Sequence, residues 1–230
     1  MNPLILAIET SSLWTGVAVS QGAEILASRQ LLTQAGHTEA LSALIAECLT
    51  HSGKESKDID LLAVSIGPGS FTALRIGLLT AQGIALARGI KIVPVMTLDV
   101  LNESLPFSEE MEFRLPVIDA YKNEVFTAFY QGNKKMSEAV IVDPCFVSAL
   151  VGGSVHKEPV TVFGPAVEKY EASLRASLKK RIRFPDNLKL SPNPEALVRL
   201  AWKRRDECVS PDALQPYYIR MPDAKRPKSQ

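Results

Sequence analysis

The chain has 230 residues, of which 46% are hydrophobic and 22% charged, and its net charge is +1. This is the balance of an ordinary globular protein, and no uninterrupted apolar run reaches membrane length, so no membrane-spanning helix is expected. Its N-terminus has no charged segment before an apolar core, and its three cysteines form no C-x-x-C pair. We therefore expect a cytoplasmic protein with neither a zinc site nor a disulfide framework.

In the first half of the chain, apolar runs with strand character precede segments with helical periodicity. Three such runs, separated by short polar turns, should pair as antiparallel strands. Helices and further strands then alternate, which predicts a mixed sheet with helices on its faces. The expected strands are Leu4–Ile8, Thr15–Ser20, Ala23–Leu32, Leu61–Ile66 and Lys91–Val95, and the expected helices are His37–Leu49, Ser70–Arg88 and Leu98–Leu105.

A polar, acidic stretch around Pro106 is a plausible domain boundary. We expect an N-terminal domain at 1–105, a smaller C-terminal domain at 106–220 and a disordered tail at 221–230. The second half loosely repeats the first. Its expected strands are Leu115–Asp119, Val125–Tyr130, Val140–Val142 and Val160–Phe163, and its expected helices are Pro144–Leu150, Pro165–Leu178 and Ala196–Arg205.

The segment from Leu61 to Leu86 combines a buried strand, a Gly-Pro-Gly turn and a long helix. A column of small residues runs along one face of that helix, at a spacing of four: Ala73, Gly77, Ala81 and Ala85. Glycine inside a helix costs about 0.5–1 kcal/mol relative to alanine, so a packing reason is expected. Two interpretations stay open: the column packs on the chain's own sheet, or it meets another subunit.

The turn Gly67-Pro68-Gly69 resembles a phosphate-binding loop only weakly. Pro68 removes one backbone donor, no Gly-Lys-Ser/Thr ending follows, and Thr72 stands where a dinucleotide motif has its third glycine. A structural turn is therefore the favoured interpretation.

No convincing catalytic set is present. His37 lacks the second histidine of a metal pair, since position 41 is leucine, and there is no Gly-x-Ser-x-Gly nucleophile motif. Glu9 and Asp119 stand at strand ends, where a carboxylate can reach a ligand crevice. For Glu9 a ligand role and a local backbone role are equally supported, and for Asp119 we favour the local role.

The motifs of the chain resemble those of the bacterial proteins that make threonylcarbamoyladenosine in tRNA, and most closely the non-catalytic TsaB (YeaZ) family. The resemblance spans nearly the whole chain. It rests on Ile8-Glu9-Thr10-Ser11-Ser12, Thr15-Gly16-Val17-Ala18-Val19, His37-Thr38-Glu39-Ala40-Leu41, Gly67-Pro68-Gly69-Ser70-Phe71-Thr72, Leu74-Arg75-Ile76-Gly77, Asp119-Ala120, Glu124-Val125 and Pro216-Tyr217-Tyr218-Ile219-Arg220.

This resemblance implies a two-domain α/β fold of the actin/Hsp70/sugar-kinase type and a scaffold without chemistry or cofactor of its own. The family's catalytic relative carries a metal-binding His-x-x-x-His, whereas Pro94–Leu101 here contains no histidine. The implied partners are that catalytic relative and an ATPase of the same pathway, with a homodimer in isolation. Contact with tRNA is expected to be indirect or weak, and no membrane contact is expected.

The resemblance also places the subunit interface on helices of the first domain. We predict that the interface contains Leu41, Ala73, Leu74, Arg75, Gly77, Leu78, Ala81 and Ala85. A vestigial nucleotide or anion loop would contain Glu9, Thr10, Ser11, Gly67, Gly69 and Ser70. The alternative function is a small-molecule phosphotransferase of the same fold, which would need phosphate loops in both halves and a carboxylate facing the cleft.

The small net charge hides an asymmetry along the chain. Residues 171–230 carry a net charge of +7 and the rest of the chain −6. A basic C-terminal region could meet nucleic acid or an acidic partner, or it could be a solvated surface, and the sequence leaves this open.

Overall fold

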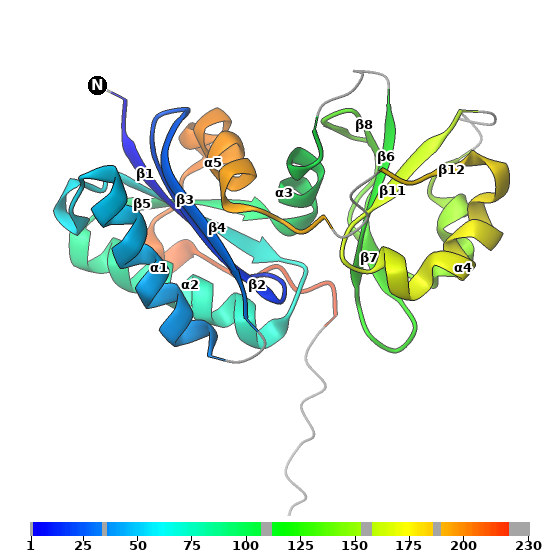
Figure 1. Ribbon diagram of the computed structural model, residues 1–230, viewed down its shortest axis with the longest axis horizontal. Helices are drawn as coiled ribbons and strands as arrows, with labels where there is room; N and C mark the ends of the chain where they lie inside the picture. The colour runs from blue at the N-terminus through cyan, green and yellow to red at the C-terminus, as the bar shows by residue number, and fades with distance from the viewer. Residues whose placement is uncertain (1, 34–35, 107–111, 153–157, 186–189, 221–230) are drawn as a thin grey trace, which may run out of the picture.

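The computed structural model describes residues 2–33, 36–106, 112–152, 158–185 and 190–220, which form two β-sheets with helices packed on them (Figure 1). The mixed α/β architecture predicted from the sequence is confirmed. The predicted tail at 221–230 lies outside the described residues. Among the residues that are described, none belongs to a helix long and apolar enough to cross a membrane.

The first sheet has five strands in the order β3-β2-β1-β4-β5. Short turns join the first three strands, which therefore pair antiparallel, and β4 and β5 extend the sheet parallel to β1. The strands are β1 (Leu4–Glu9), β2 (Trp14–Gln21), β3 (Glu24–Leu32), β4 (Leu61–Gly67) and β5 (Lys91–Met96).

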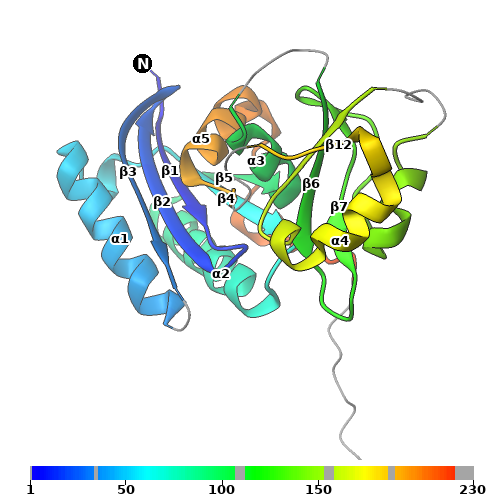
Figure 2. The ribbon, with the colours of Figure 1, turned by 45° about the vertical axis from the view of Figure 1, so that its right-hand side comes forward.

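Helices cover both faces of this sheet. The helices of the first half are α1 (His37–Ser52), α2 (Phe71–Arg88) and α3 (Thr97–Ser104). Both α1 and α2 end at a glycine with positive φ, Gly53 and Gly89, as predicted, because glycine adopts the left-handed conformation that closes a helix at little cost. Figure 2 shows α1 on one side of the strands and α5 (Pro194–Lys203) on the other.

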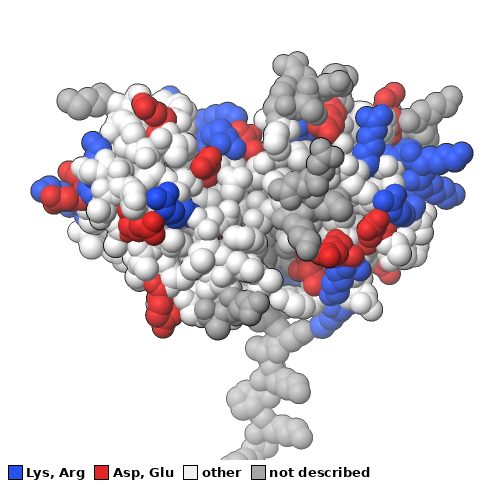
Figure 3. Space-filling view, in the orientation of Figure 1, with Lys and Arg blue, Asp and Glu red and all other residues white. Residues whose placement is uncertain are grey.

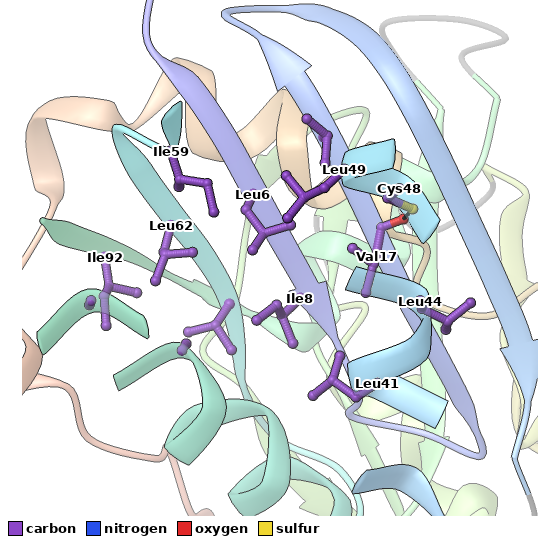
Figure 4. Close-up of a cluster of buried hydrophobic side chains, with 14 of the residues drawn as sticks. Leu6, Ile8, Val17, Leu41, Leu44, Cys48, Leu49, Ile59, Leu62 and Ile92 are labelled. Atoms are coloured by element: carbon purple, nitrogen blue, oxygen red, sulfur yellow. Dashed lines mark hydrogen bonds between the residues drawn. The ribbon is translucent and has the colours of Figure 1, made fainter. Parts of the chain in front are cut away.

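The alternation of side chains along the strands produces a core on each face of the first sheet. Leu6 and Ile8 of β1 point toward α1 and α2, where they pack with Leu41 and Cys48 (Figure 4). Ile5 and Ala7, which alternate with them along β1, point to the opposite face and pack in the cluster that α5 covers. Every residue of β1 is therefore buried.

The second sheet has the order β10-β7-β6-β11-β12, with β8 paired to β6 and β9 paired to β8. Its core packs under α4 (Val167–Leu178) and the 3₁₀ helix η2 (Pro144–Ala149). The strands are β6 (Phe113–Asp119), β7 (Val125–Thr127), β8 (Tyr130–Gln131), β9 (Lys134–Lys135), β10 (Val140–Val142), β11 (Val160–Phe163) and β12 (Ile182–Arg183).

Two predicted elements of the second half differ from the structure, and two short strands were not predicted. The strand expected over Val125–Tyr130 is divided into β7 and β8, which pair with different parts of β6. The helix expected over Pro144–Leu150 is the 3₁₀ helix η2, in a segment whose valine, phenylalanine, serine and cysteine are weak α-helix formers. The short strands β9 and β12 were not predicted.

The chain returns to the first sheet after the second sheet is complete. Helix α5 packs against β1 and its neighbours, Ile92 pairs with Val209, and the Tyr217 N–H donates to the Ile66 carbonyl at 2.8 Å. Because these contacts tie residues 194–217 to the first sheet, we propose that they belong to the N-terminal domain rather than to the expected domain at 106–220.

Candidate functional site

The loop between β1 and β2 packs directly on the inward face of α2. Thr10 Oγ1 donates to the Ala73 carbonyl at 2.8 Å in a buried site. A β-carbon on Gly77 would lie well within 3.0 Å of Thr10 Oγ1, so the glycine leaves room for this loop. The small-residue column of α2 is therefore explained by close packing within the chain itself.

The same loop also fills the space beside the Gly67-Pro68-Gly69 turn. The Ser70 N–H donates to the Ser11 carbonyl at 2.9 Å, and a β-carbon on Gly69 would collide with that carbonyl oxygen. The turn thus places backbone against backbone. The structural interpretation of the turn is the one that this geometry supports.

Glu9 lies at the end of β1 and is completely buried. Its carboxylate accepts from the Ser11 N–H at 2.7 Å and from the hydroxyls of Ser11 and Ser65. Burial raises the pKa of Glu9, and these hydrogen bonds oppose the rise without cancelling it. Of the two roles left open for Glu9, the structure shows the local one: its side chain joins the loop to β4 and does not face a cleft.

Asp119 ends β6 and organises the turn that follows it. It accepts from the Tyr121 N–H at 2.9 Å, from Lys169 Nζ at 2.8 Å and from the Tyr170 hydroxyl at 2.9 Å. Burial would raise the pKa of Asp119, but the hydrogen bonds from Lys169, Tyr170 and the Tyr121 backbone outweigh it and hold the pKa below its ordinary value. These contacts agree with the local role favoured for this residue, which also lines a cleft.

A cleft of about 320 Å³ lies between the two sheets, and only part of the predicted anion loop reaches it. Ser11 and Ser70 line the cleft, whereas Glu9 is enclosed behind them. The N–H groups of Ser11 and Ser70 already donate to Glu9 and to the Ser11 carbonyl. The complete lining is Ser11, Ser12, Leu13, Ser70, Ile118, Asp119, Tyr121 and Pro165.

These residues fit a nucleotide phosphate poorly. A phosphate loop needs backbone N–H groups that point at the ligand, and here the N–H groups of Ser11 and Ser70, the two loop residues that line the cleft, are used within the chain. A phosphotransferase also needs a carboxylate directed at the reacting groups, and Glu9 is held away from solvent. The geometry therefore does not support the alternative function.

The small-residue column that was predicted to meet another subunit lies on the inward face of α2. The chain's own strands and loop already bury it, and the same is true of the neighbouring leucines. Arg75 is the exposed member of the predicted interface. The buried members are Leu41, Ala73, Leu74, Gly77, Leu78, Ala81 and Ala85.

The opposite face of α2 is the surface that sequence reasoning missed. Leu79 and Leu86 are 66% and 60% exposed, and a β-carbon on Gly83, between them, would meet no atom within 4 Å. Arg75 and Arg88 are the charged residues of this 18-residue helix. The absence of acidic residues and the scarcity of charge were a signal in the sequence, because a solvated helix face ordinarily carries several charges.

His37 and Cys48 of α1 have local roles. His37 Nδ1 lies 2.8 Å from Thr15 Oγ1, and burial lowers its pKa. Burial raises the pKa of Cys48 to about 11, so its thiol is unreactive at neutral pH. Within the described part of the chain, no three His, Cys, Asp or Glu side chains are grouped so that they could hold a metal ion.

The family model and several of the relatives that match this sequence are named for the same tRNA modification. A family model described as TsaD, tRNA N6-adenosine threonylcarbamoyltransferase, matches residues 25–204. The tRNA threonylcarbamoyladenosine biosynthesis protein TsaB of Escherichia coli is 35% identical over 127 residues, which are 55% of this chain and 54% of that protein. The chain thus spans about half the length of this relative. TsaB of Bacillus subtilis is 24% identical over 96% of both proteins.

Solved structures share the fold. The structure named YeaZ from Pseudomonas aeruginosa superposes with a TM-score of 0.80, covering 95% of this chain and all of that one at 24% identity. A more distant neighbour is a ROK hexokinase from Thermus thermophilus, with a TM-score of 0.51 and 11% identity, covering 85% of this chain and 98% of that one. The fold is therefore of the actin/Hsp70/sugar-kinase type, as expected.

Proposed function

The chain belongs to the TsaB (YeaZ) family, and from this membership we propose that it takes part in the biosynthesis of threonylcarbamoyladenosine in tRNA. The observation that carries the proposal is the match of the family model over residues 25–204 together with relatives named for this pathway. The chemistry implied is transfer of a threonylcarbamoyl group to an adenosine.

Within this pathway the chain acts as a scaffold and not as the transferase. Pro94–Leu101, which corresponds to the family's metal-binding segment, contains no histidine that could serve as a ligand. The one carboxylate of the β1–β2 loop region, Glu9, is enclosed by Ser11 and Ser65. Both observations favour a supporting role. The partners of this scaffold are the catalytic threonylcarbamoyltransferase and an ATPase of the same pathway.

The outward face of α2 binds the catalytic partner. It presents Leu79, Gly83 and Leu86 to solvent on a helix that has charge only at Arg75 and Arg88. Large apolar side chains that are more than half exposed gain free energy when a partner covers them. A glycine between them lets a partner helix approach closely, as small residues do at tight helix contacts.

The same face also explains a homodimer in the absence of the partner. A two-fold contact places one surface patch against the same patch of a second copy. A helix face with few charges can pack against itself in this way without repulsion between like charges. We expect the homodimer and the complex with the catalytic partner to be mutually exclusive, because both would bury Leu79 and Leu86.

Reconstitution of the tRNA modification tests the proposed function. The catalytic transferase, the ATPase and threonylcarbamoyl-adenylate are mixed with unmodified tRNA, with and without this chain, and the modified nucleoside is measured. Modification that depends on the chain supports the scaffold. Equal modification without the chain contradicts it, and magnesium-dependent ATP binding by the isolated chain would favour the phosphotransferase instead.

A further inference from the structure

Most of the positive charge that the structure describes in the C-terminal region lies in two groups with different surroundings. One group lies on α5, which packs on the first sheet, and the other follows α4 at the far edge of the second sheet. Figure 3 shows blue side chains gathered at the right-hand edge, over the end of α4 and β12, whereas blue and red are interspersed over the first sheet.

Acidic side chains neutralise the group on α5. Arg199 and Lys203 both lie near the Glu103 carboxylate, at 3.4 and 3.0 Å. Arg204 donates to Asp99 at 2.9 Å. The partners on α3 thus offset most of the charge that the sequence places on this helix.

The group that follows α4 has no such partners. Lys179, Lys180 and Arg183 are exposed, and among the described residues none of them forms an ion pair. Arg181, which lies between them in the sequence, is half-buried. It donates to the Glu158 carbonyl at 3.2 Å, and this uncharged acceptor leaves the positive charge of Arg181 in place. We call Lys179, Lys180, Arg181 and Arg183 the basic cluster.

The backbone that carries the basic cluster is held in place. Lys179 has a positive φ of 54° at the end of α4, where it turns the chain into the 3₁₀ helix η4 (Lys179–Arg181). Ile182 and Arg183 then pair in parallel with β11. Beside them the Arg175 guanidinium lies 4.6 Å from the centre of the Phe184 ring. The backbone of the basic cluster is therefore held in one position at the edge of the second sheet.

We propose that Lys179, Lys180 and Arg183 bind the phosphate backbone of RNA. This inference rests on the proposed function, which supplies tRNA as the polyanion, and it adds a contact surface on the second sheet to that function. Lysine and arginine side chains that neutralise phosphates release counterions, which favours binding without reading the base sequence. A contact of this kind is weak at physiological salt.

RNA fits this cluster better than an anionic membrane does. Stable binding to a lipid surface needs apolar side chains that enter the interface beside the basic ones. None of the large exposed apolar residues of the described chain lies between residues 158 and 185, and Phe184 is partly covered by Arg175. The neighbouring η2, which packs against α4, presents one large exposed apolar side chain, that of Phe146. A phosphate backbone, by contrast, needs only the exposed cations.

The test measures how the binding of unmodified tRNA to the full chain depends on salt. A Lys180→Gln/Arg183→Gln variant removes two contacts, and an Arg199→Gln/Lys203→Gln variant is the matched control, because it also removes one lysine and one arginine. Each lost phosphate contact lowers the slope of log K against log[salt] by about 0.7–0.9. We expect the cluster variant to lose about 1.5 in slope and to bind at least about tenfold more weakly at low salt. The control should keep the slope.

Three outcomes would overturn the proposal. The first is an equal slope for the cluster variant, the control and the unaltered chain, with equal unfolding midpoints. The second is no tRNA binding by the unaltered chain at about 10 mM salt, where screening is weakest. The third is binding to vesicles of anionic lipid that the cluster variant loses while its tRNA binding is unchanged. None of these outcomes depends on the reconstituted modification, so failure of the RNA surface is distinguished from failure of the scaffold role.

Discussion

The two faces of α2 contain similar residues in opposite surroundings. On the inward face Gly77 lies against Thr10, whose hydroxyl donates a hydrogen bond to the Ala73 carbonyl. On the outward face Gly83 lies in open space between the exposed Leu79 and Leu86. A column of small residues therefore indicates close approach of another segment, but it does not say whether that segment belongs to the same chain.

The difference also changes which substitutions can report on a partner. A bulky residue at position 77 would disturb the monomer, because the β1–β2 loop occupies that space. A bulky residue at position 83 would meet solvent in the monomer and a neighbour only in a complex. The outward face is thus the one on which binding can be separated from folding.

The largest expected effect is that of Gly77→Leu on stability. The added side chain must displace Thr10 or the loop that carries it, and overpacking of this kind costs about 3 kcal/mol or more. Urea unfolding would measure the loss. Gly83→Leu is the control on the same helix, and it should not destabilise the chain, because its side chain meets open space and leucine is a better helix former than glycine. Equal losses for the two variants would contradict the packing described here.

The next effect in size is that of Leu79→Arg on partner binding. Removing an apolar anchor from the centre of an interface and adding a charge there costs about 2 kcal/mol or more, which is roughly a 30-fold loss of affinity. Titration of the catalytic transferase with each variant would measure it. Phe146→Arg is the matched control, because Phe146 is 64% exposed and lies on η2, outside α2. Unchanged affinity for Leu79→Arg would move the interface away from this face.

Local sequence patterns predicted most of the first sheet. Apolar runs of strand length, short turns and stop glycines are local signals, and β1 to β5 with α1 and α2 formed where those signals lie. The return of α5 to the first sheet was missed because no local pattern states where a helix docks. One general rule would have helped. The crossovers from β3 to β4 and from β4 to β5 run in the same direction along the sheet, so right-handed connections place α1 and α2 on the same face. Since β1 is buried on both faces, another helix must cover the other face.

The candidate site was predicted less completely than the fold. The sequence identified Glu9 and the Gly67-Pro68-Gly69 turn as special, but it could not decide between a ligand and an internal role. That decision depends on Ser65, which is 56 residues from Glu9 in the chain, and on the Ser11 carbonyl against Gly69. Contacts of such long range come from tertiary packing, which a single sequence does not show.

The pH dependence of stability tests how the loop over the inward face is held. Burial raises the pKa of Glu9 above its ordinary value of 4.5, so the folded chain holds this proton more tightly than the unfolded chain does. The stabilisation from the proton is complete below about pH 4.5 and is lost as the pH rises through the folded pKa. Glu9→Gln stays neutral at every pH, so its stability relative to the unaltered chain should rise with pH.

Urea unfolding of both proteins between about pH 4 and pH 8 measures this difference. We expect Glu9→Gln to match the unaltered chain at the acidic end and to exceed it at neutral pH. Glu39→Gln, at an exposed position on α1, is the control and should show no such trend. A difference that is constant across the range would mean that Glu9 is charged in the folded protein despite its burial.

The smallest expected effect is that of Gly83→Ala, and its sign distinguishes the two faces most sharply. In the monomer the added methyl group meets open space, so the gain in helix propensity should stabilise the chain by about 0.5–1 kcal/mol. In a complex the same methyl group would hold a closely packed partner helix away, and affinity should fall. Thermal unfolding of the monomer and titration of the partner measure the two quantities. Gly77→Ala offers the contrast, because it should destabilise the monomer at a position that Thr10 already fills. A rise in both stability and affinity for Gly83→Ala would exclude close packing at this position and place the contact toward Leu86 or Leu79 instead.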